Sequence, residues 1–358
     1  MEAGKLIGEG SKTCVFKPNL PCKNKNIQIS NNNISKVFLT EKEQKFLKRE
    51  IKFNKKIKKL KNSDIWSVTL FNICDVANYE EILKIEKDIK KCLQNQKISI
   101  EKFNKNKNML YGLYGGINMY DHIDNFFNNQ FNAELASDFI KKTHSLFYGL
   151  TIMNKNKILH YDIKGGNIVF SNNRYKYIDF GISTTFGNIS KIKKRALSEY
   201  NNKRIYIYYP YELFYIFIDK KQINNELKKR PFTNRDDHNH LEYINNVVFN
   251  RNINQEIMEN INDIKNNKIK LNKVIELLDI YSLGITLTNI LIEKINKYVY
   301  VENINKNKKI INDILYHPTL LPFTKLLKQM TEISSNDRIT PDDALDELES
   351  ILNYYPNY

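Results

Sequence analysis

The chain has 358 residues, of which 41% are hydrophobic and 27% are charged, and its formal net charge is +16. These proportions are typical of a folded protein with a substantial core, and they exclude a chain that is disordered throughout. No uninterrupted run of about eighteen apolar residues occurs, so no membrane-spanning helix is expected. The basic excess leaves nucleic-acid binding open but does not favour it, because Lys, Asn, Ile and Tyr are all abundant, as in AT-rich genes.

Four cysteines are present at positions 14, 22, 74 and 92, and none forms the C-x-x-C pair of a zinc ribbon or a redox motif. So few cysteines in a chain of this length predict reduced thiols. The first residues do not resemble a signal peptide. We therefore expect a cytoplasmic protein.

The first hundred or so residues predict short strands and one long helix. Leu6–Ile7 and Cys14–Phe16 flank a glycine turn, as the two strands of a hairpin do. Apolar residues at helical spacing among Lys, Glu and Gln predict a helix over Glu41–Leu60. Further strands are expected at Ile34–Leu39, Trp66–Ile73 and Met109–Tyr114, and an inserted helix at Glu80–Cys92.

The rest of the chain predicts mainly helices. Apolar residues recur at helical spacing from Leu135 to Met153, and Leu277–Ile292 is apolar almost throughout. Between these two helices, Phe170–Tyr175 has the pattern of a hairpin. The stretch from Phe214 to Val274 is dense in Asn, Lys, Asp and Glu, and it predicts an insertion of weak helices and loops.

The glycine turn has a pattern that suits anion binding. Gly8 and Gly10 lie two residues apart, and without Cβ atoms they let backbone N–H groups approach a phosphate. A tight hairpin turn is an equally good interpretation. A Walker P-loop is excluded, because the Gly-Lys-Ser/Thr that it requires does not follow.

The segment His160–Asn167 places three functional side chains between a predicted helix and a short strand. Asp162 can accept a hydroxyl proton, Lys164 can contact a phosphate oxygen, and Asn167 can ligate a metal ion. About a dozen residues later, Asp179 opens the tripeptide Asp-Phe-Gly. Its carboxylate suits a Mg²⁺ ion that bridges phosphates, because hard cations prefer oxygen ligands.

Together these motifs resemble the eukaryotic-type protein kinase family over nearly the whole chain. The sequence around Cys14–Pro18 resembles in particular the protein kinases of large DNA viruses. The resemblance implies ATP and Mg²⁺ as cofactors, with Asp162 as the catalytic base, Lys164 as the catalytic phosphate contact, and Asn167 and Asp179 as the metal ligands.

The resemblance also implies a set of nucleotide-binding residues. Val15 would pack on adenine, Lys36 would hold the α- and β-phosphates, and Glu50 would be the helix partner of Lys36, with Glu43 as the alternative. The whole set is Ile7, Gly8, Glu9, Gly10, Val15, Lys36 and Glu50. Lys36, Asp162, Asn167 and Asp179 are expected to meet around one metal-bound triphosphate.

The fold that the resemblance implies is α+β and bilobal, within a single kinase domain over residues 1–358. A small β-rich N-lobe with one main helix would cover about 1–113, and a hinge about 114–118. A larger, mostly α-helical C-lobe would cover about 119–356, with the insertion at about 214–274.

Three later features separate protein kinases from related small-molecule kinases. Pro210-Tyr211-Glu212 resembles the end of an activation segment, and Asp279 opens a stretch like the start of the buried central helix. Arg338 resembles the arginine that pairs with the glutamate ending the segment. We therefore expect a buried ion pair between Glu212 and Arg338.

The predicted function is transfer of the γ-phosphoryl group of ATP to serine or threonine of a protein, and Lys164 favours these acceptors over tyrosine. A viral enzyme of this kind would lie in the host cytoplasm or the virion. The alternatives are a small-molecule kinase of the aminoglycoside or choline type and a non-catalytic pseudokinase. Tyr161 replaces the arginine that normally pairs with a phosphorylated activation loop, so activity without that phosphorylation is expected.

Overall fold

The structure is a computed structural model that describes residues 4–10, 13–23, 29–84, 87–105, 108–126, 133–202, 206–229, 236–298 and 313–354. The fold is α+β and has two compact units. The first unit comprises Met1–Gly116 and Ile178–Ser183, and the second comprises Ile117–Tyr177 and Thr184–Tyr358. Ile178–Ser183 thus belongs to the first unit, although it directly follows Tyr177 in the sequence.

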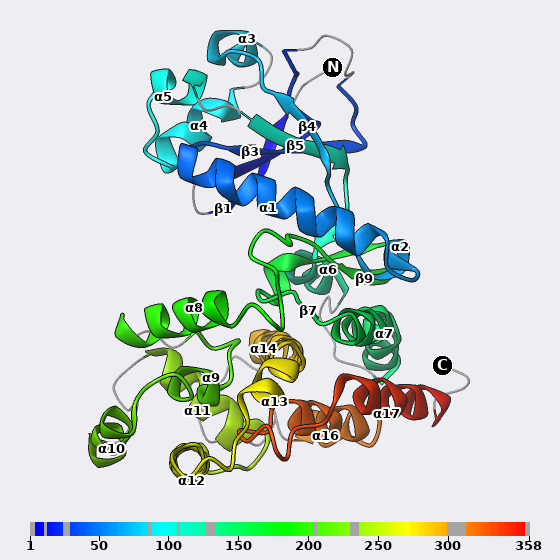
Figure 1. Ribbon diagram of the computed structural model, residues 1–358. Helices are drawn as coiled ribbons and strands as arrows, with labels where there is room; N and C mark the ends of the chain where they lie inside the picture. Colours follow the sequence, from blue (N-terminus) through cyan, green and yellow to red (C-terminus); the bar gives the residue numbers. More distant parts are fainter. Residues whose placement is uncertain are drawn as a thin grey trace. The chain divides into compact units, whose positions relative to one another are not determined.

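A five-stranded antiparallel sheet forms the centre of the first unit, in the order β1-β2-β3-β5-β4 (Figure 1). Its strands are β1 (Lys5–Gly10), β2 (Thr13–Lys17), β3 (Asn33–Phe38), β4 (Asn72–Asp75) and β5 (Asn108–Leu113). The predicted hairpin is confirmed, with Gly8 opposite Val15. In β3, Ser35 and Val37 are buried on one face and Lys36 lies on the other, because side chains alternate along a strand.

Helix α1 (Glu41–Lys58) lies along this sheet (Figure 1) and confirms the long helix that the sequence predicts. It begins at Thr40, whose hydroxyl accepts a hydrogen bond from the backbone N–H of Glu43. Leu47, Glu50 and Ile57 are buried and recur at helical spacing on one side. Burial of that side turns the Glu50 carboxylate inward.

The described residues of the first unit also form the short helices α2 (Ser63–Trp66), α3 (Tyr79–Leu83), α4 (Asp88–Asn95) and α5 (Ile100–Lys105). The strand expected at Trp66–Ile73 is confirmed only at its end, because β4 begins at Asn72 and local hydrogen bonds close a helical turn up to Trp66. Ser67 N donates to Ser63 O at 2.8 Å, and Trp66 Nε1 donates to Lys61 O at 3.1 Å. The helix expected at Glu80–Cys92 is divided into α3 and α4, which lets both Ile82 and Ile89 enter one apolar cluster.

The expectation that the cysteines are reduced thiols is wrong. The structure pairs Cys14 with Cys92 and Cys22 with Cys74, with Cα–Cα distances of 6.3 and 6.0 Å. These distances lie within the usual range for disulfides. The partners are separated by 78 and 52 residues, so their proximity follows from the packing of the sheet and helices rather than from any spacing in the sequence.

The second unit is mostly helical. Its helices are α6 (Met119–Phe126), α7 (Ala133–Lys155), α8 (Ile189–Asn201), α9 (Tyr211–Tyr215), α10 (Lys220–Lys229), α11 (Asp236–Val248), α12 (Ile253–Lys265), α13 (Leu271–Glu276), α14 (Leu278–Tyr298), α16 (Leu321–Met330) and α17 (Pro341–Tyr354). Its strands are β6 (Ile117–Asn118), β7 (Ile158–Leu159), β8 (Ile168–Ser171), β9 (Arg174–Tyr177) and β10 (Thr184–Thr185). They form the sheets β6-β8-β9 and β7-β10.

Several predictions for the second unit are confirmed. Strands β8 and β9 form the expected hairpin, and its turn residues Asn172 and Asn173 adopt the positive φ angles that asparagine tolerates. The apolar helix expected at Leu277–Ile292 is α14, which continues to Tyr298. The insertion is more ordered than predicted, because the isoleucines of α12 recur at helical spacing and enter the core.

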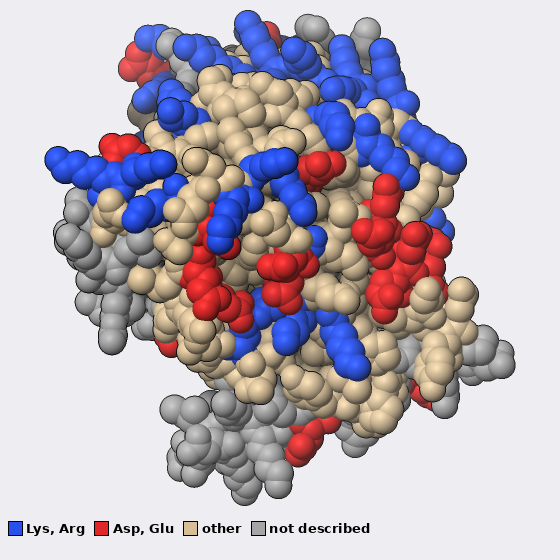
Figure 2. Space-filling model, turned by 60° about the horizontal axis from the view of Figure 1, so that its bottom comes forward, with Lys and Arg blue, Asp and Glu red and all other residues tan. Residues whose placement is uncertain are grey.

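Two further properties of the structure are the apolarity of its helices and the distribution of charge on its surface. Among the helices in the described ranges, none is both long and apolar enough to cross a membrane. Charged side chains gather by sign on the face shown in Figure 2, with Lys and Arg in dense groups and Asp and Glu in separate ones.

Candidate active site

A lysine held by two carboxylates is the main polar feature of the first unit. Lys36 Nζ on β3 lies 2.9 Å from Glu50 Oε2 on α1 and 2.9 Å from Asp179 Oδ1. It also donates to Glu50 Oε1 at 3.1 Å. The structure thus selects Glu50, rather than Glu43, as the helix partner of Lys36. All three residues were predicted from the sequence, and the structure brings them together within one unit.

The environment of this triad perturbs its ionisation. The side chains of Lys36 and Glu50 are only 12% and 4% exposed. Burial disfavours the charged form of Lys36, but the charges of Asp179 and Glu50 outweigh it and raise the pKa of Lys36. Burial raises the pKa of Glu50 to about 7, and the charge of Lys36 acts against this rise. Lys36 therefore remains a cation that the two carboxylates orient.

Asp179 occupies an unusual backbone conformation. Its φ angle is 61°, in the left-handed region that asparagine and aspartate tolerate better than most residues. Oδ1 also accepts a hydrogen bond from the backbone N–H of Gly181 at 3.3 Å. A Cβ at position 181 would lie 3.1 Å from Glu50 Oε2 and from Asp179 Oδ1, so glycine there leaves room for both carboxylates.

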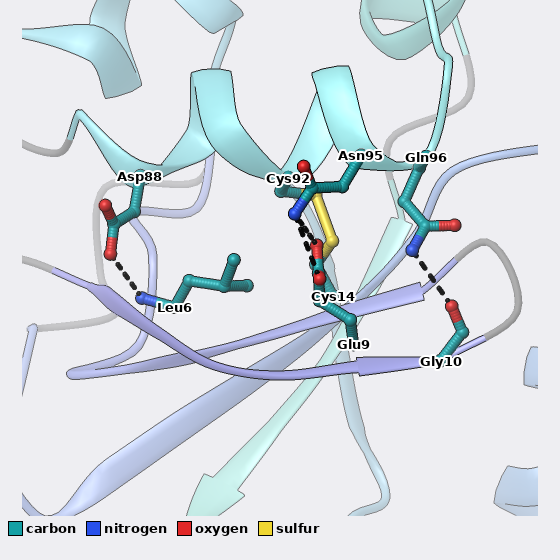
Figure 3. The surroundings of a disulfide bond; sticks show 8 residues. All are labelled: Leu6, Glu9, Gly10, Cys14, Asp88, Cys92, Asn95 and Gln96. Carbon is teal, nitrogen blue, oxygen red and sulfur yellow. Dashed lines mark hydrogen bonds between the residues drawn. A yellow bond between two sulfur atoms is a disulfide. The ribbon is translucent and has the colours of Figure 1, made fainter.

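The glycine turn is fastened to helix α4, as Figure 3 shows. Asn95 Nδ2 donates to both carboxylate oxygens of Glu9 at 3.1 Å, and Gln96 Nε2 donates to Gly10 O at 3.1 Å. The Cys14–Cys92 disulfide joins the same helix to β2. Together with the Leu6–Asp88 hydrogen bond of 3.0 Å, these contacts limit the motion of the hairpin. They also engage Glu9, which was expected to bind the nucleotide.

The other predicted nucleotide-binding residues lie in the same hairpin. Ile7 is exposed on β1, and Val15 lies on β2 opposite Gly8. A Cβ at position 8 would lie 3.7 Å from Val15, so packing alone does not require glycine there. A Cβ at position 10 would lie 2.5 Å from the Thr13 hydroxyl, so the turn favours glycine at that position.

Asp162 is the centre of a second polar group, in the second unit. Lys164 Nζ donates to Asp162 Oδ2 at 3.1 Å, and Asn167 Nδ2 donates to the same oxygen and to the Asp162 backbone carbonyl at 2.8 Å. Tyr206 donates to the other oxygen, Oδ1, at 2.5 Å. The three residues predicted from the loop are thus in mutual contact, and Tyr206 joins them.

Asp279 fixes the backbone that leads into Asp162. Its buried carboxylate, near the start of α14, accepts hydrogen bonds from the N–H groups of His160 at 2.6 Å and Tyr161 at 3.1 Å. Burial raises its pKa to about 7, although the two hydrogen bonds act to lower it. Downstream, a Cβ at Gly165 would lie 2.5 Å from the ring of Tyr120, so the loop needs glycine to pass this ring.

Tyr161 is buried and links the loop to the following segment. Its ring stacks on Tyr209, with centroids 5.0 Å apart and planes 15° apart. Its hydroxyl donates to Ile192 O at 3.2 Å, and the Tyr209 hydroxyl donates to Tyr161 O at 2.7 Å. The guanidinium of Arg195, on α8, lies 5.4 Å from the centroids of both rings. Stacking and cation–π contacts thus hold Tyr209 and Arg195 of the following segment against Tyr161 of the loop.

The expected Glu212–Arg338 ion pair is present. Arg338 Nη2 lies 2.8 Å from Glu212 Oε1, and both side chains are fully buried. Glu212 Oε2 accepts a further hydrogen bond from Ser335 N at 2.9 Å, and Arg338 donates to three backbone carbonyls. The pair ties α9 to the segment before α17.

The side chains expected to hold magnesium are oxygen donors. Asp179 keeps a side chain that is 40% exposed, and Asn167 carries an amide oxygen. This donor chemistry fits a hard cation that is bound mainly by phosphates and water. No cluster of three or more His, Cys, Asp or Glu side chains suited to a metal occurs in the parts of the chain that the structure describes.

Two residues of these groups were not predicted. Tyr206 lies in a tyrosine-rich run before Pro210, and the run signals aromatic packing without showing which hydroxyl reaches Asp162. Arg195 belongs to a basic run on α8, and only the fold shows that it lies over aromatic rings. No known protein-family model matches the chain, and no curated protein matches it.

Proposed function

We propose that the chain is an ATP- and Mg²⁺-dependent protein kinase that phosphorylates serine or threonine. The observation that carries the proposal is the hold of Glu50 and Asp179 on Lys36, with Nζ–O distances of 2.9 Å to each carboxylate. A buried, oriented lysine cation suits contact with a triphosphate. The Asp162 group, formed by an independent part of the chain, supplies the proton acceptor that transfer to a hydroxyl requires.

Each residue has a distinct role in this proposal. Lys36 neutralises charge on the phosphates, and Glu50 keeps its side chain oriented. Asp179 and Asn167 would hold Mg²⁺, which neutralises the phosphates of bound ATP. Asp162 accepts the proton of the acceptor hydroxyl, and Lys164 lies beside it, where a cation can stabilise a transferring phosphoryl group.

The support for a protein acceptor comes from the second unit. The buried Glu212–Arg338 pair and the hydrogen bonds of Asp279 to the loop are the features that the resemblance associates with protein kinases rather than small-molecule kinases. Lys164, two residues after Asp162, favours serine and threonine acceptors. A viral kinase acting in host cytoplasm or the virion is part of the same proposal.

The test measures phosphate transfer from labelled ATP to a set of acceptors that includes generic proteins, aminoglycosides and choline. We expect the wild type to label protein and Asp162→Asn to lose transfer by about 10²–10⁴-fold while still binding nucleotide. Asp121→Asn, at an exposed carboxylate on α6, is the matched control and should retain transfer. Transfer to the small molecules alone would show that the acceptor is a small molecule and not a protein. Full activity of Asp162→Asn would contradict the proposal.

A further inference from the structure

The outer side of α1 carries a single kind of side chain. Between residues 45 and 61, every exposed residue is a lysine. These residues are Lys45, Lys48, Lys52, Lys55, Lys56, Lys58, Lys59 and Lys61. The buried residues of the helix, among them Glu50, lie on the opposite side. We call Lys45, Lys48, Lys52, Lys55, Lys56 and Lys59 the lysine face.

The lysine face is a straight row. With 100° of rotation for each residue, its six members fall within an arc of about 100° around the helix axis. From Lys45 to Lys59 the row is about 21 Å long, since an α-helix rises about 1.5 Å for each residue. A nucleic-acid duplex of that length presents roughly six phosphates on each strand. The row therefore matches a linear series of negative charges.

No acidic side chain in the part of the chain that the structure describes neutralises the lysine face. Lys58, beside it, forms an ion pair with Asp64, but the six members of the face form no ion pair with any residue in the described ranges. Lysines three or four positions apart repel one another by roughly 0.2–0.5 kcal/mol for each pair. The helix dipole favours cations in the last turn. It does not account for Lys45, Lys48 or Lys52.

Composition does not account for the lysine face either. The same chain has a helix, α17, whose exposed residues include Asp342, Asp343, Asp346, Glu347 and Glu349. The exposed positions of α12 include asparagine, glutamine and glutamate. A general excess of lysine would place lysines on each of these helices. Figure 2 likewise shows positive and negative side chains in separate groups.

We propose that the lysine face of α1 binds the phosphate backbone of a nucleic acid without sequence preference. Phosphate contacts need only a row of cations, and lysine contacts of this kind provide affinity rather than base recognition. A protein partner would be expected to use aromatic and apolar anchors, and the face offers none. An interfacial helix would insert apolar side chains into a membrane, whereas every exposed side chain from Lys45 to Lys58 of α1 is a lysine, and Leu47 and Ile57 are buried within the unit.

The experiment measures binding of the full chain to a fluorescently labelled DNA duplex of about 24 base pairs, by anisotropy over a salt series without ATP. The variant Lys48→Gln/Lys52→Gln/Lys55→Gln keeps the helix, because glutamine has a similar helix propensity. Glu50 lies on the other side, so the triad of Lys36 is not altered. We expect this variant to bind about tenfold more weakly or worse near 100 mM salt, with a salt slope smaller by about 2.7.

The matched control, Lys270→Gln/Lys325→Gln/Lys328→Gln, removes the same charge from exposed lysines of the second unit. It should bind within about twofold of the wild type. An equal loss in both variants would overturn the proposal, because net charge alone would then explain binding. Absence of wild-type binding at about 50 mM salt would also overturn it, as would binding to anionic phospholipid vesicles without binding to DNA.

Discussion

The hydroxyl of Tyr206 donates a hydrogen bond of 2.5 Å to Oδ1 of Asp162. Burial, the charge of Asp162 and this hydrogen bond raise the pKa of Tyr206, so its hydroxyl stays protonated and acts as the donor. An acceptor hydroxyl would make the same contact with the proposed catalytic base. If Asp162 is the catalytic base, as we propose, Tyr206 would compete with the acceptor for this oxygen.

Removal of the Tyr206 hydroxyl should increase activity towards protein. A hydrogen bond to a charged group contributes roughly 1.5–3 kcal/mol, so we expect Tyr206→Phe to raise kcat/KM for the protein acceptor by about ten- to a hundredfold. The KM for ATP should change little. Steady-state kinetics with both substrates measures these values.

Tyr208→Phe is the matched control, because the Tyr208 hydroxyl faces Tyr120 at 3.4 Å rather than Asp162. It should leave kcat/KM unchanged within about twofold. A loss of activity in Tyr206→Phe alone would show that the hydroxyl positions Asp162 instead of competing with the acceptor.

The buried Glu212–Arg338 pair should be needed as a pair. Loss of one partner leaves a buried charge without compensation, so Glu212→Gln or Arg338→Met should each lower the free energy of unfolding by about 3–5 kcal/mol. The double variant should lose less than the sum of the two single losses. Chemical denaturation of the four proteins measures this coupling, and strictly additive losses would show that the two residues act independently.

The raised pKa of Asp279 predicts a pH dependence of stability. Burial raises this pKa from 3.8 to about 7, so the folded state favours the protonated form. Its contribution to stability is fully present below about pH 4 and is lost as the pH rises through 7, by about 4 kcal/mol at most. Unfolding of the wild type and Asp279→Asn between pH 5 and 8 tests this sign. A wild type that gains stability relative to the variant over this range would contradict it.

The Cys14–Cys92 disulfide should stabilise the first unit. It closes a loop with a sequence separation of 78 residues, and loss of such a bond costs typically about 2–4 kcal/mol. Replacement of both cysteines by serine should lower the melting temperature, measured without reductant. Addition of reductant should lower the melting temperature of the wild type further than that of the variant. Equal melting temperatures of the two proteins without reductant would show that the bond contributes nothing.

Local patterns predicted much of the fold. The β1–β2 hairpin, α1, the β8–β9 hairpin and α14 were predicted because turn residues or apolar periodicity specify them within a few residues. The start of the strand expected at Trp66–Ile73 was not predicted correctly, because hydrogen bonds of Ser67 to Ser63 close a helical turn up to Trp66 and the strand begins only at Asn72.

The candidate site was predictable where a motif holds its residues close in sequence or the resemblance supplies them. A motif holds Asp162, Lys164 and Asn167 close together in sequence. The resemblance supplied Lys36 and Glu50. The disulfides and the contact of Tyr206 with Asp162 join positions that are 44 to 78 residues apart. Only the packing of the elements brings these positions together.

The most direct test of the proposed kinase is phosphate transfer from labelled ATP to protein by the wild type and by Lys36→Met. Lys17→Met is the control, because Lys17 is also a strand lysine but lies over the ring of Tyr114, 3.6 Å from its centroid. We expect transfer by the wild type and by Lys17→Met, and a loss of at least about a hundredfold in Lys36→Met with the fold retained by circular dichroism. Equal transfer by Lys36→Met and the wild type, or no transfer by any of the three, would contradict the account.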